Sequence, residues 1–308
     1  MKDDRDPVTE GLGMDPWGDV APVPLGKGAV VGNYIIEELR AQGGLASVYR
    51  ARHVVIGRTV ALKVLHRHLG TSSSALRRFQ QEAQVLGRLR HPNLVDIFDF
   101  GDHEGAPYLV MEWLCGPTLG EELGARGPLT LDEIGKIFLP LGSALAAAHR
   151  LGVVHRDIKA SNVVLADATP GGMAERKQRI VKLIDFGIAK LLSEELPVPK
   201  TTVGTRLGTP ASMAPEQILG DRVDARTDIY ALGVLLFQAA TGKLPFAARS
   251  QLELDELHLS AVPPRPSEWA PAATPLDGLV LSCLEKSPEA RPSSVEKLMS
   301  ELEAATAT

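Results

Sequence analysis

The sequence predicts an α+β protein in which a small β-rich unit precedes a larger, mainly helical unit, with a cleft between the two. Short β-rich runs separated by glycines fill residues 34–64. Beyond Trp113 the apolar residues recur at helical spacing, and residues 229–240 are almost all apolar, which predicts a helix in the middle of a helical unit. The 308 residues include 44% hydrophobic side chains, enough for a core that needs no disulfide or metal.

The β-rich unit is expected to contain short strands and one helix. Strands are expected at residues 34–36, 47–49, 59–64, 94–98 and 108–111. A helix is expected over residues 72–89, because Leu76, Phe79, Ala83 and Leu86 form one apolar stripe.

In the helical unit, two segments begin with the capping-box pattern, a threonine followed three residues later by a glutamate. These pairs are Thr118 with Glu121 and Thr130 with Glu133. The second pair begins a long apolar helix that ends near Arg150. Residues 275–305 are expected to form two closing helices.

Composition and charge limit the location and the partners. Residues 1–32 contain prolines and glycines with little periodicity, which predicts a flexible leader. The net charge of −5 gives no reason to expect nucleic acid as a partner. Cys115 and Cys283 lie far apart, which favours a reducing compartment. No stretch predicts a membrane segment or a secretory signal, so a cytoplasmic protein is expected.

Lys63 and Glu82 are the first candidate functional pair. Lys63 lies in an otherwise apolar strand, and Glu82 lies between Phe79 and Leu86 on the helix face that should be buried. A buried carboxylate needs a partner, because breaking a buried pair costs roughly 3–5 kcal/mol. The alternative is that both long side chains reach solvent separately.

A polar loop follows the long helix. In residues 155–162, Asp157 can accept a hydroxyl proton, Lys159 can neutralise a phosphoryl group, and Asn162 offers an oxygen to Mg²⁺. Asp185 then follows a second apolar run and precedes Phe186-Gly187, and its carboxylate also suits a hard cation.

These features occur in the order found in one protein family. The ordered residues are Val60-Ala61-Leu62-Lys63, Glu82, the hinge Val110-Met111-Glu112, residues 155–162, Asp185-Phe186-Gly187, Ala214-Pro215-Glu216, Asp228 and Arg291. On these residues the chain resembles the eukaryotic-type protein kinases, and the bacterial serine/threonine kinases most of all. The resemblance covers about residues 34–302 and implies a two-lobed protein kinase-like fold, with an N-lobe at 33–112 and a C-lobe at 113–306.

The resemblance implies transfer of the γ-phosphoryl group of ATP to serine or threonine hydroxyls of proteins, with Mg²⁺ or Mn²⁺ as the metal. It assigns Lys63 to the α- and β-phosphates, braced by Glu82. Asp157 would orient and deprotonate the substrate hydroxyl beside Lys159, and Asn162 and Asp185 would hold the metal. The implied nucleotide-binding residues are Arg40, Ala41, Gly43, Gly44, Ala46, Val48, Ala61, Lys63, Met111, Glu112, Leu114 and Val164.

Further residues take supporting and regulatory roles by the same resemblance. Glu216 and Arg291 would pair inside the C-lobe, and Asp228 would anchor the catalytic loop. Lys159 together with Thr209 is the arrangement of serine/threonine-directed kinases. Thr201, Thr202 and Thr205 are candidate autophosphorylation sites, where a phosphate could pair with Arg156 and order the segment.

The chain departs from the family pattern in the glycine-rich loop and at Ala160, Ser161 and Ser212. Ala160 stands where a proline is frequent. In the glycine-rich loop, Ala41 and Ala46 replace glycines, and Arg40 replaces an apolar residue over the adenine. Because alanine resists positive φ and its methyl limits approach to phosphate, weaker ATP binding is expected. Ser212 replaces a frequent aromatic residue. Ser161 replaces an acid found in relatives that prefer basic substrates, so no such preference is predicted.

Two other functions stay open. A scaffold of the kinase fold with little or no turnover would explain the altered loop, although it would not need Lys63, Asp157 and Asp185 together. A small-molecule phosphotransferase would share the Asp…Asn…Asp core, but such enzymes usually lack the Ala214-Pro215-Glu216 segment. The physiological substrate and the oligomeric state are left open.

Overall fold

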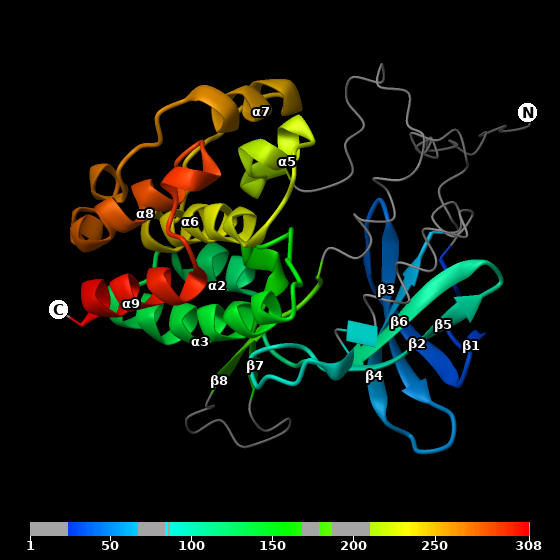
Figure 1. Cartoon of the computed structure of the whole chain (residues 1–308). Helices are drawn as coiled ribbons and strands as arrows, with labels where there is room; N and C mark the ends of the chain where they lie inside the picture. The colour runs from blue at the N-terminus through cyan, green and yellow to red at the C-terminus, as the bar shows by residue number, and fades with distance from the viewer. Residues whose placement is uncertain (1–23, 67–83, 86, 168–178, 187–209, 308) are drawn as a thin grey trace, which may run out of the picture.

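The structure is a computed structural model that describes residues 24–66, 84–85, 87–167, 179–186 and 210–307. Figure 1 shows the large sheet on one side of the molecule and the helices on the other, connected by the segment that follows β6. The predicted α+β class with two lobes is therefore confirmed.

An antiparallel sheet forms the N-lobe, with its described strands in the spatial order β1-β2-β3-β4-β6-β5. The strands are β1 (Val30–Val31), β2 (Tyr34–Gln42), β3 (Ala46–His53), β4 (Thr59–Leu65), β5 (Ile97–His103) and β6 (Ala106–Glu112). In β4, Val60, Leu62 and Val64 are buried in the N-lobe core. Because side chains alternate along a strand, Ala61 and Lys63 face the opposite side.

Two boundaries expected from the sequence are wrong. Val30–Val31 pairs with β2, and the amide of Leu25 donates to the Tyr49 hydroxyl at 3.0 Å, so residues 24–32 belong to the N-lobe rather than to a leader. The strand expected at 94–98 begins only at Ile97, because Leu94 bridges to Leu183 instead. Most of the helix expected at 72–89 lies outside the described residues, and residues 84–85 and 87–88 are helical.

The C-lobe is mainly helical. Its described helices are α2 (Leu119–Arg126), α3 (Leu131–Arg150), α5 (Pro215–Leu219), α6 (Ala225–Thr241), α7 (Gln251–Ser260), α8 (Asp277–Cys283) and α9 (Val295–Thr306). A separate small sheet consists of β7 (Val163–Asp167) and β8 (Arg179–Leu183). The short 3₁₀ helices are η2 (Ala160–Asn162), η3 (Pro210–Ser212), η4 (Pro266–Glu268), η5 (Pro271–Leu276) and η6 (Pro288–Ala290).

Local sequence signals set the ends of the first two C-lobe helices. Thr118 and Thr130 each accept a hydrogen bond from the backbone of the glutamate three residues later, whose carboxylate bonds back to the threonine amide. Both predicted capping boxes are therefore confirmed.

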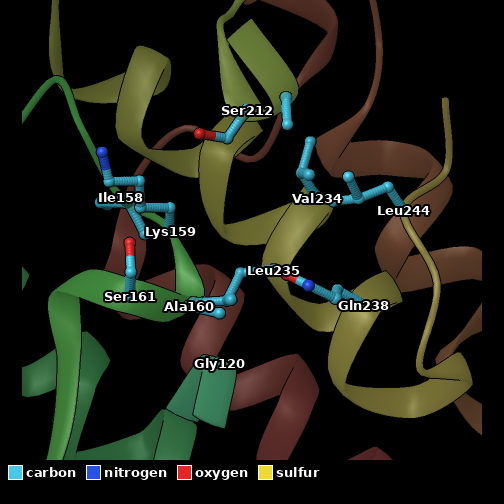
Figure 2. Close-up of a pocket in the computed structure, with 11 residues that line it drawn as sticks. Gly120, Ile158, Lys159, Ala160, Ser161, Ser212, Val234, Leu235, Gln238 and Leu244 are labelled. Carbon is cyan, nitrogen blue, oxygen red and sulfur yellow. The ribbon is translucent and has the colours of Figure 1, made fainter. Parts of the chain in front are cut away.

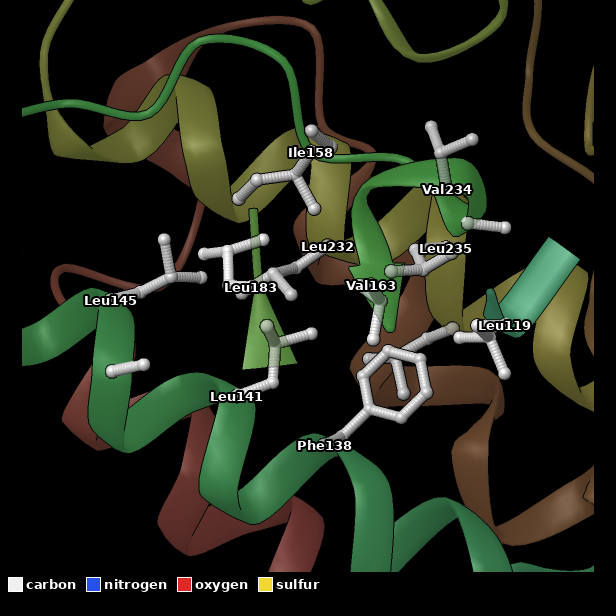
Figure 3. Close-up of a cluster of buried hydrophobic side chains, with 14 of the residues drawn as sticks. Leu119, Phe138, Leu141, Leu145, Ile158, Val163, Leu183, Leu232, Val234 and Leu235 are labelled. Atoms are coloured by element: carbon white, nitrogen blue, oxygen red, sulfur yellow. The ribbon is translucent and has the colours of Figure 1, made fainter. Parts of the chain in front are cut away.

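The loop of residues 155–162, called the catalytic loop below, is held against the C-lobe core. Residues 227–237 of α6 are all buried, as expected for the apolar run. Figure 3 shows Ile158 of the loop packed with side chains of α3 and α6, and Ile158 has no exposed surface. Burying such a side chain contributes about 1.5–3 kcal/mol, so the loop is fixed by packing as well as by hydrogen bonds. In the part of the chain that the structure describes, no helix is long and apolar enough to cross a bilayer.

Candidate active site

Asp228 fixes the backbone of the loop that carries Asp157. Asp228 lies in the first turn of α6 and is fully buried. Its carboxylate accepts hydrogen bonds from the backbone amides of His155 and Arg156, both at 2.8 Å, and lies 2.7 Å from Nε2 of His149. Arg156 has φ +65°, a conformation that costs energy for a residue other than glycine. The paired amides therefore hold a strained turn directly before Asp157.

Asp157, Lys159 and Asn162 meet at the end of this loop. The Asn162 side-chain amide donates to the Asp157 carbonyl at 2.8 Å and to its carboxylate at 3.0 Å. The Lys159 ammonium lies 2.9 Å from the same Asp157 carboxylate. Because Nδ2 of Asn162 is engaged by Asp157, its oxygen is the side-chain group left for a cation.

His155 links this loop to the segment that contains Asp185, a role that sequence reasoning missed. Its Nε2 donates to the Ile184 carbonyl at 3.0 Å, and its Nδ1 accepts from the Asp157 amide at 3.3 Å. Burial lowers the pKa of His155 below its ordinary value, against the opposing attraction of Asp228. The neutral ring satisfies both contacts, and it lies 4.7 Å from the Phe186 ring, centroid to centroid.

Lys63 reaches across from the N-lobe sheet to Asp185. Their side chains form an ion pair between residues 122 positions apart in the chain. Asp185 has φ +67°, so its backbone is also held in a conformation that is unfavourable for a non-glycine residue. The expected partner of Lys63, Glu82, lies outside the described residues.

The donor set around Asp157 fits a divalent cation of the Mg²⁺ type. Asp185 offers a carboxylate and Asn162 an amide oxygen, and Mg²⁺ prefers oxygen ligands that it shares with phosphates and water. Among the described residues, no group of three or more His, Cys, Asp or Glu side chains could hold a metal by itself. A cation at this place would therefore depend on the phosphates of a nucleotide for further ligands.

The backbone of the glycine-rich loop does not adopt the positive φ angles that were expected at Ala41 and Ala46. Ala41 is the partner of Val48 in the β2–β3 ladder, and Gly43 donates to the Ala46 carbonyl at 2.9 Å. In the described chain no residue between 40 and 48 has positive φ. The expected conformational cost of alanine at positions 41 and 46 is therefore wrong. Only the bulk of the two methyl groups remains as a reason to expect weaker ATP binding.

Other predicted nucleotide contacts lie where β4 and β6 lead into the hinge. Ala61 is the ladder partner of Met111, and the Glu112 amide already donates to the Asp96 carbonyl at 2.9 Å. The hinge group of Glu112 left for an adenine is therefore its carbonyl oxygen. Arg40 lies over the ring of Trp113 at 5.7 Å and pairs with Glu38 at 3.0 Å, both of which sequence reasoning missed.

The expected contact between Glu216 and Arg291 is present. Two parallel hydrogen bonds of 2.8 Å join the guanidinium to the carboxylate, and Thr227 donates a third at 2.7 Å. Burial raises the pKa of Glu216, but the bonds from Arg291 and Thr227 outweigh burial and hold it below its ordinary value. Thr201, Thr202, Thr205 and Thr209 lie outside the described residues.

Comparisons with known proteins agree with this geometry. Residues 34–302 match the family described as protein kinase domain. The chain is 38% identical over 276 residues to the serine/threonine-protein kinase pkn3 of Myxococcus xanthus. The aligned region covers 88% of this chain and 49% of that protein. It is 34% identical over 277 residues to the serine/threonine-protein kinase PrkC of Bacillus subtilis, which covers 90% and 41%. The chain thus spans about half or less of the length of these relatives.

A solved structure is also similar. The crystal structure of the Mycobacterium tuberculosis PknI kinase domain matches with a TM-score of 0.71 and 25% identity, over 92% of this chain and 100% of that chain.

Proposed function

This chain belongs to the protein kinase family, and on that basis we propose that it transfers the γ-phosphoryl group of ATP to serine or threonine hydroxyls of proteins. One observation carries the proposal. Lys63 of the N-lobe sheet contacts Asp185, and Asp185 is tied through Ile184 and His155 to the loop that holds Asp157 and Asn162. The Lys63 ammonium, the proton-accepting carboxylate of Asp157 and the metal-binding oxygens are thus connected across the two lobes.

The residues support an in-line transfer with a defined path for the proton. The substrate hydroxyl oxygen bonds to the γ-phosphorus while its proton moves to the Asp157 carboxylate. The bond from phosphorus to the bridging oxygen breaks, and ADP leaves with that electron pair. Lys159, 2.9 Å from Asp157, supplies positive charge beside the transferring group. When bound, Mg²⁺ held by Asn162 and Asp185 would neutralise charge on the phosphates.

The test compares the intact protein with the Asp157→Asn variant. Each is incubated with Mg²⁺ and ATP labelled in the γ-phosphate, with added protein substrates, and the labelled residues are identified by mass spectrometry. The intact protein should label serine or threonine, and the variant should be slower by about 10²–10⁴-fold because a general base is lost. Asp132→Asn is the matched control, because that carboxylate is 69% exposed and pairs with Lys136 on the surface of α3.

Two outcomes would reject the proposal. If both proteins bind ATP but neither transfers phosphate, the scaffold function is correct. If label reaches only a small molecule, the chain is a small-molecule phosphotransferase.

Autophosphorylation and location are part of the same proposal. Transfer to Thr201, Thr202 or Thr205 is tested with a variant in which all three are alanine, which should be less active if their phosphates order the segment. Action in the cytoplasm rests on the cysteine usage of the sequence, and cell fractionation tests it.

A further inference from the structure

A surface cavity of about 260 Å³ lies in the C-lobe beside the catalytic loop. Figure 2 shows it between the start of α2, the loop around Lys159, η3 and the middle of α6. The residues that line it are Gly120, Ile158, Lys159, Ala160, Ser161, Ala211, Ser212, Val234, Leu235, Gln238 and Leu244. One wall of the cavity is therefore the same loop that carries Asp157.

The described lining is mainly apolar and carries no negative charge. Its polar side chains other than Lys159 are two serines and Gln238, and none of the described lining residues has a carboxylate. Lys159 is the one charged residue among them, and its ammonium is engaged by Asp157 at 2.9 Å. A cation that entered would lose its hydration and find no opposite charge in these walls.

Two departures from the family pattern meet at this cavity. Ser212 stands where an aromatic side chain is frequent, and Ser161 stands where relatives that prefer basic substrates carry an acid. Both line the same cavity, and Gly120 adds a wall without a side chain. With serine at both positions, neither residue contributes a ring or a charge to the cavity wall.

The size of the cavity limits what can fill it. Small-molecule sites are usually about 300–1,000 Å³, so this cavity suits one amino-acid side chain better than a cofactor. A peptide whose hydroxyl lies at Asp157 comes close to Lys159, whose ammonium is 2.9 Å from Asp157 and which lines the cavity.

We propose that this cavity binds an uncharged apolar side chain of the protein substrate, such as leucine or methionine, near the residue that is phosphorylated. The inference rests on the proposed function, because the occupant is the protein substrate itself. Apolar walls recognise such a side chain by burying it, and the missing carboxylate disfavours lysine and arginine at the same position.

The test measures kcat/KM for peptides with one serine acceptor in an alanine background. Leucine, methionine, lysine and arginine are placed in turn at each position around the acceptor. At one position leucine or methionine should be favoured over arginine by about tenfold or more. The readout is this ratio, so it does not depend on the overall activity of each variant.

Two lining variants and one control locate the preference. Gln238→Glu places a carboxylate in the wall at nearly constant shape, and it should lower the leucine-to-arginine ratio at that position by about tenfold. Ser212→Phe fills the cavity and should remove the preference for large apolar side chains. Gln251→Glu makes the same chemical change at the start of α7, outside the cavity, and should leave the ratio unchanged.

A binding measurement separates this inference from the proposed function. Labelled peptides with alanine in place of the acceptor serine are titrated with protein, and fluorescence anisotropy gives their affinities. If no peptide is phosphorylated but binding shows the apolar preference and loses it in Gln238→Glu, the kinase proposal fails and the cavity assignment stands. The cavity assignment is refuted if no position favours an apolar side chain, or if both lining variants keep the preference unchanged.

Discussion

Replacing Glu216 with glutamine should destabilise the protein by roughly 3–5 kcal/mol, the usual cost of removing one partner of a buried ion pair. The Arg291 side chain has no exposed surface, and that of Glu216 is 5% exposed. Arg291 also donates to the carbonyls of Arg226, Glu285 and Lys286. These three acceptors keep the guanidinium in place, so the variant leaves a buried cation without its negative partner. Glutamine also presents an NH₂ group to one of the two guanidinium nitrogens.

This loss is large compared with the total stability of an ordinary domain, about 5–15 kcal/mol. In chains of roughly 150–250 residues, each kcal/mol of lost stability lowers the melting temperature by about 2–4 °C. The melting temperature of this variant should therefore fall by about 6–20 °C. Urea unfolding followed by far-UV circular dichroism gives the free energy, and differential scanning fluorimetry gives the melting temperature.

Two further variants make this test specific. Asp132→Asn changes the exposed pair with Lys136 in the same chemical way, and it should cost no more than about 0.5 kcal/mol. The double variant Glu216→Gln with Arg291→Met should lose less than the sum of the two single losses, because no charge is then left buried. A Glu216→Gln variant as stable as Asp132→Asn would refute the reasoning.

Three other predictions concern acid stability, ATP binding and the link between the two catalytic segments. Burial, with repulsion from Lys286, lowers the pKa of His258 from 6.5 to about 4, so the unfolded chain binds this proton more tightly and stability should fall as the pH drops from 6.5 to about 4. The full effect is about 3 kcal/mol. The Tyr230 hydroxyl lies 2.8 Å from Nδ1 of His258, and glutamine at 258 also offers it a hydrogen-bonding group. His258→Gln should therefore reduce the change in urea midpoint across that window, and an unchanged slope would contradict this. Ala41→Gly should tighten ATP binding measured by calorimetry, because a methyl group beside the phosphates is removed, and it should cost about 0.5–1 kcal/mol of stability in β2. Equal or weaker ATP affinity would show that the methyl group is not an obstacle. His155→Phe keeps the ring beside Phe186 but removes the contacts to Ile184 and Asp157, and a displacement of about 1 Å there would lower kcat by roughly 10²-fold. Raising the Mg²⁺ concentration should restore part of that loss if Asp185 has moved, whereas a normal kcat would rule out the positioning role.

Local signals were sufficient for the starts of α2 and α3. The capping boxes at Thr118 and Thr130 involve residues three positions apart, so the sequence contains both partners of each hydrogen bond. The apolar run in α6 likewise predicted its own burial, because no polar face is available to meet solvent.

The errors arose where a strand is too short to give a pattern, or where the backbone geometry depends on a neighbouring strand. Val30–Val31 is too short to be recognised as a strand and exists through its pairing with β2. The prediction that Ala41 would be strained was wrong, because pairing with β3 holds this residue in an extended conformation.

The sequence by itself determined the order of the chemical groups along the chain, the starts of α2 and α3 and, through the family resemblance, the residues expected in the site. The tertiary structure decided which groups meet: Lys63 with Asp185, His155 with Ile184, and Ser161 and Ser212 around one cavity. The physical reason is separation along the chain. Caps and apolar stripes are set by neighbours within a few residues, whereas a contact between residues 122 positions apart exists only after both lobes have packed.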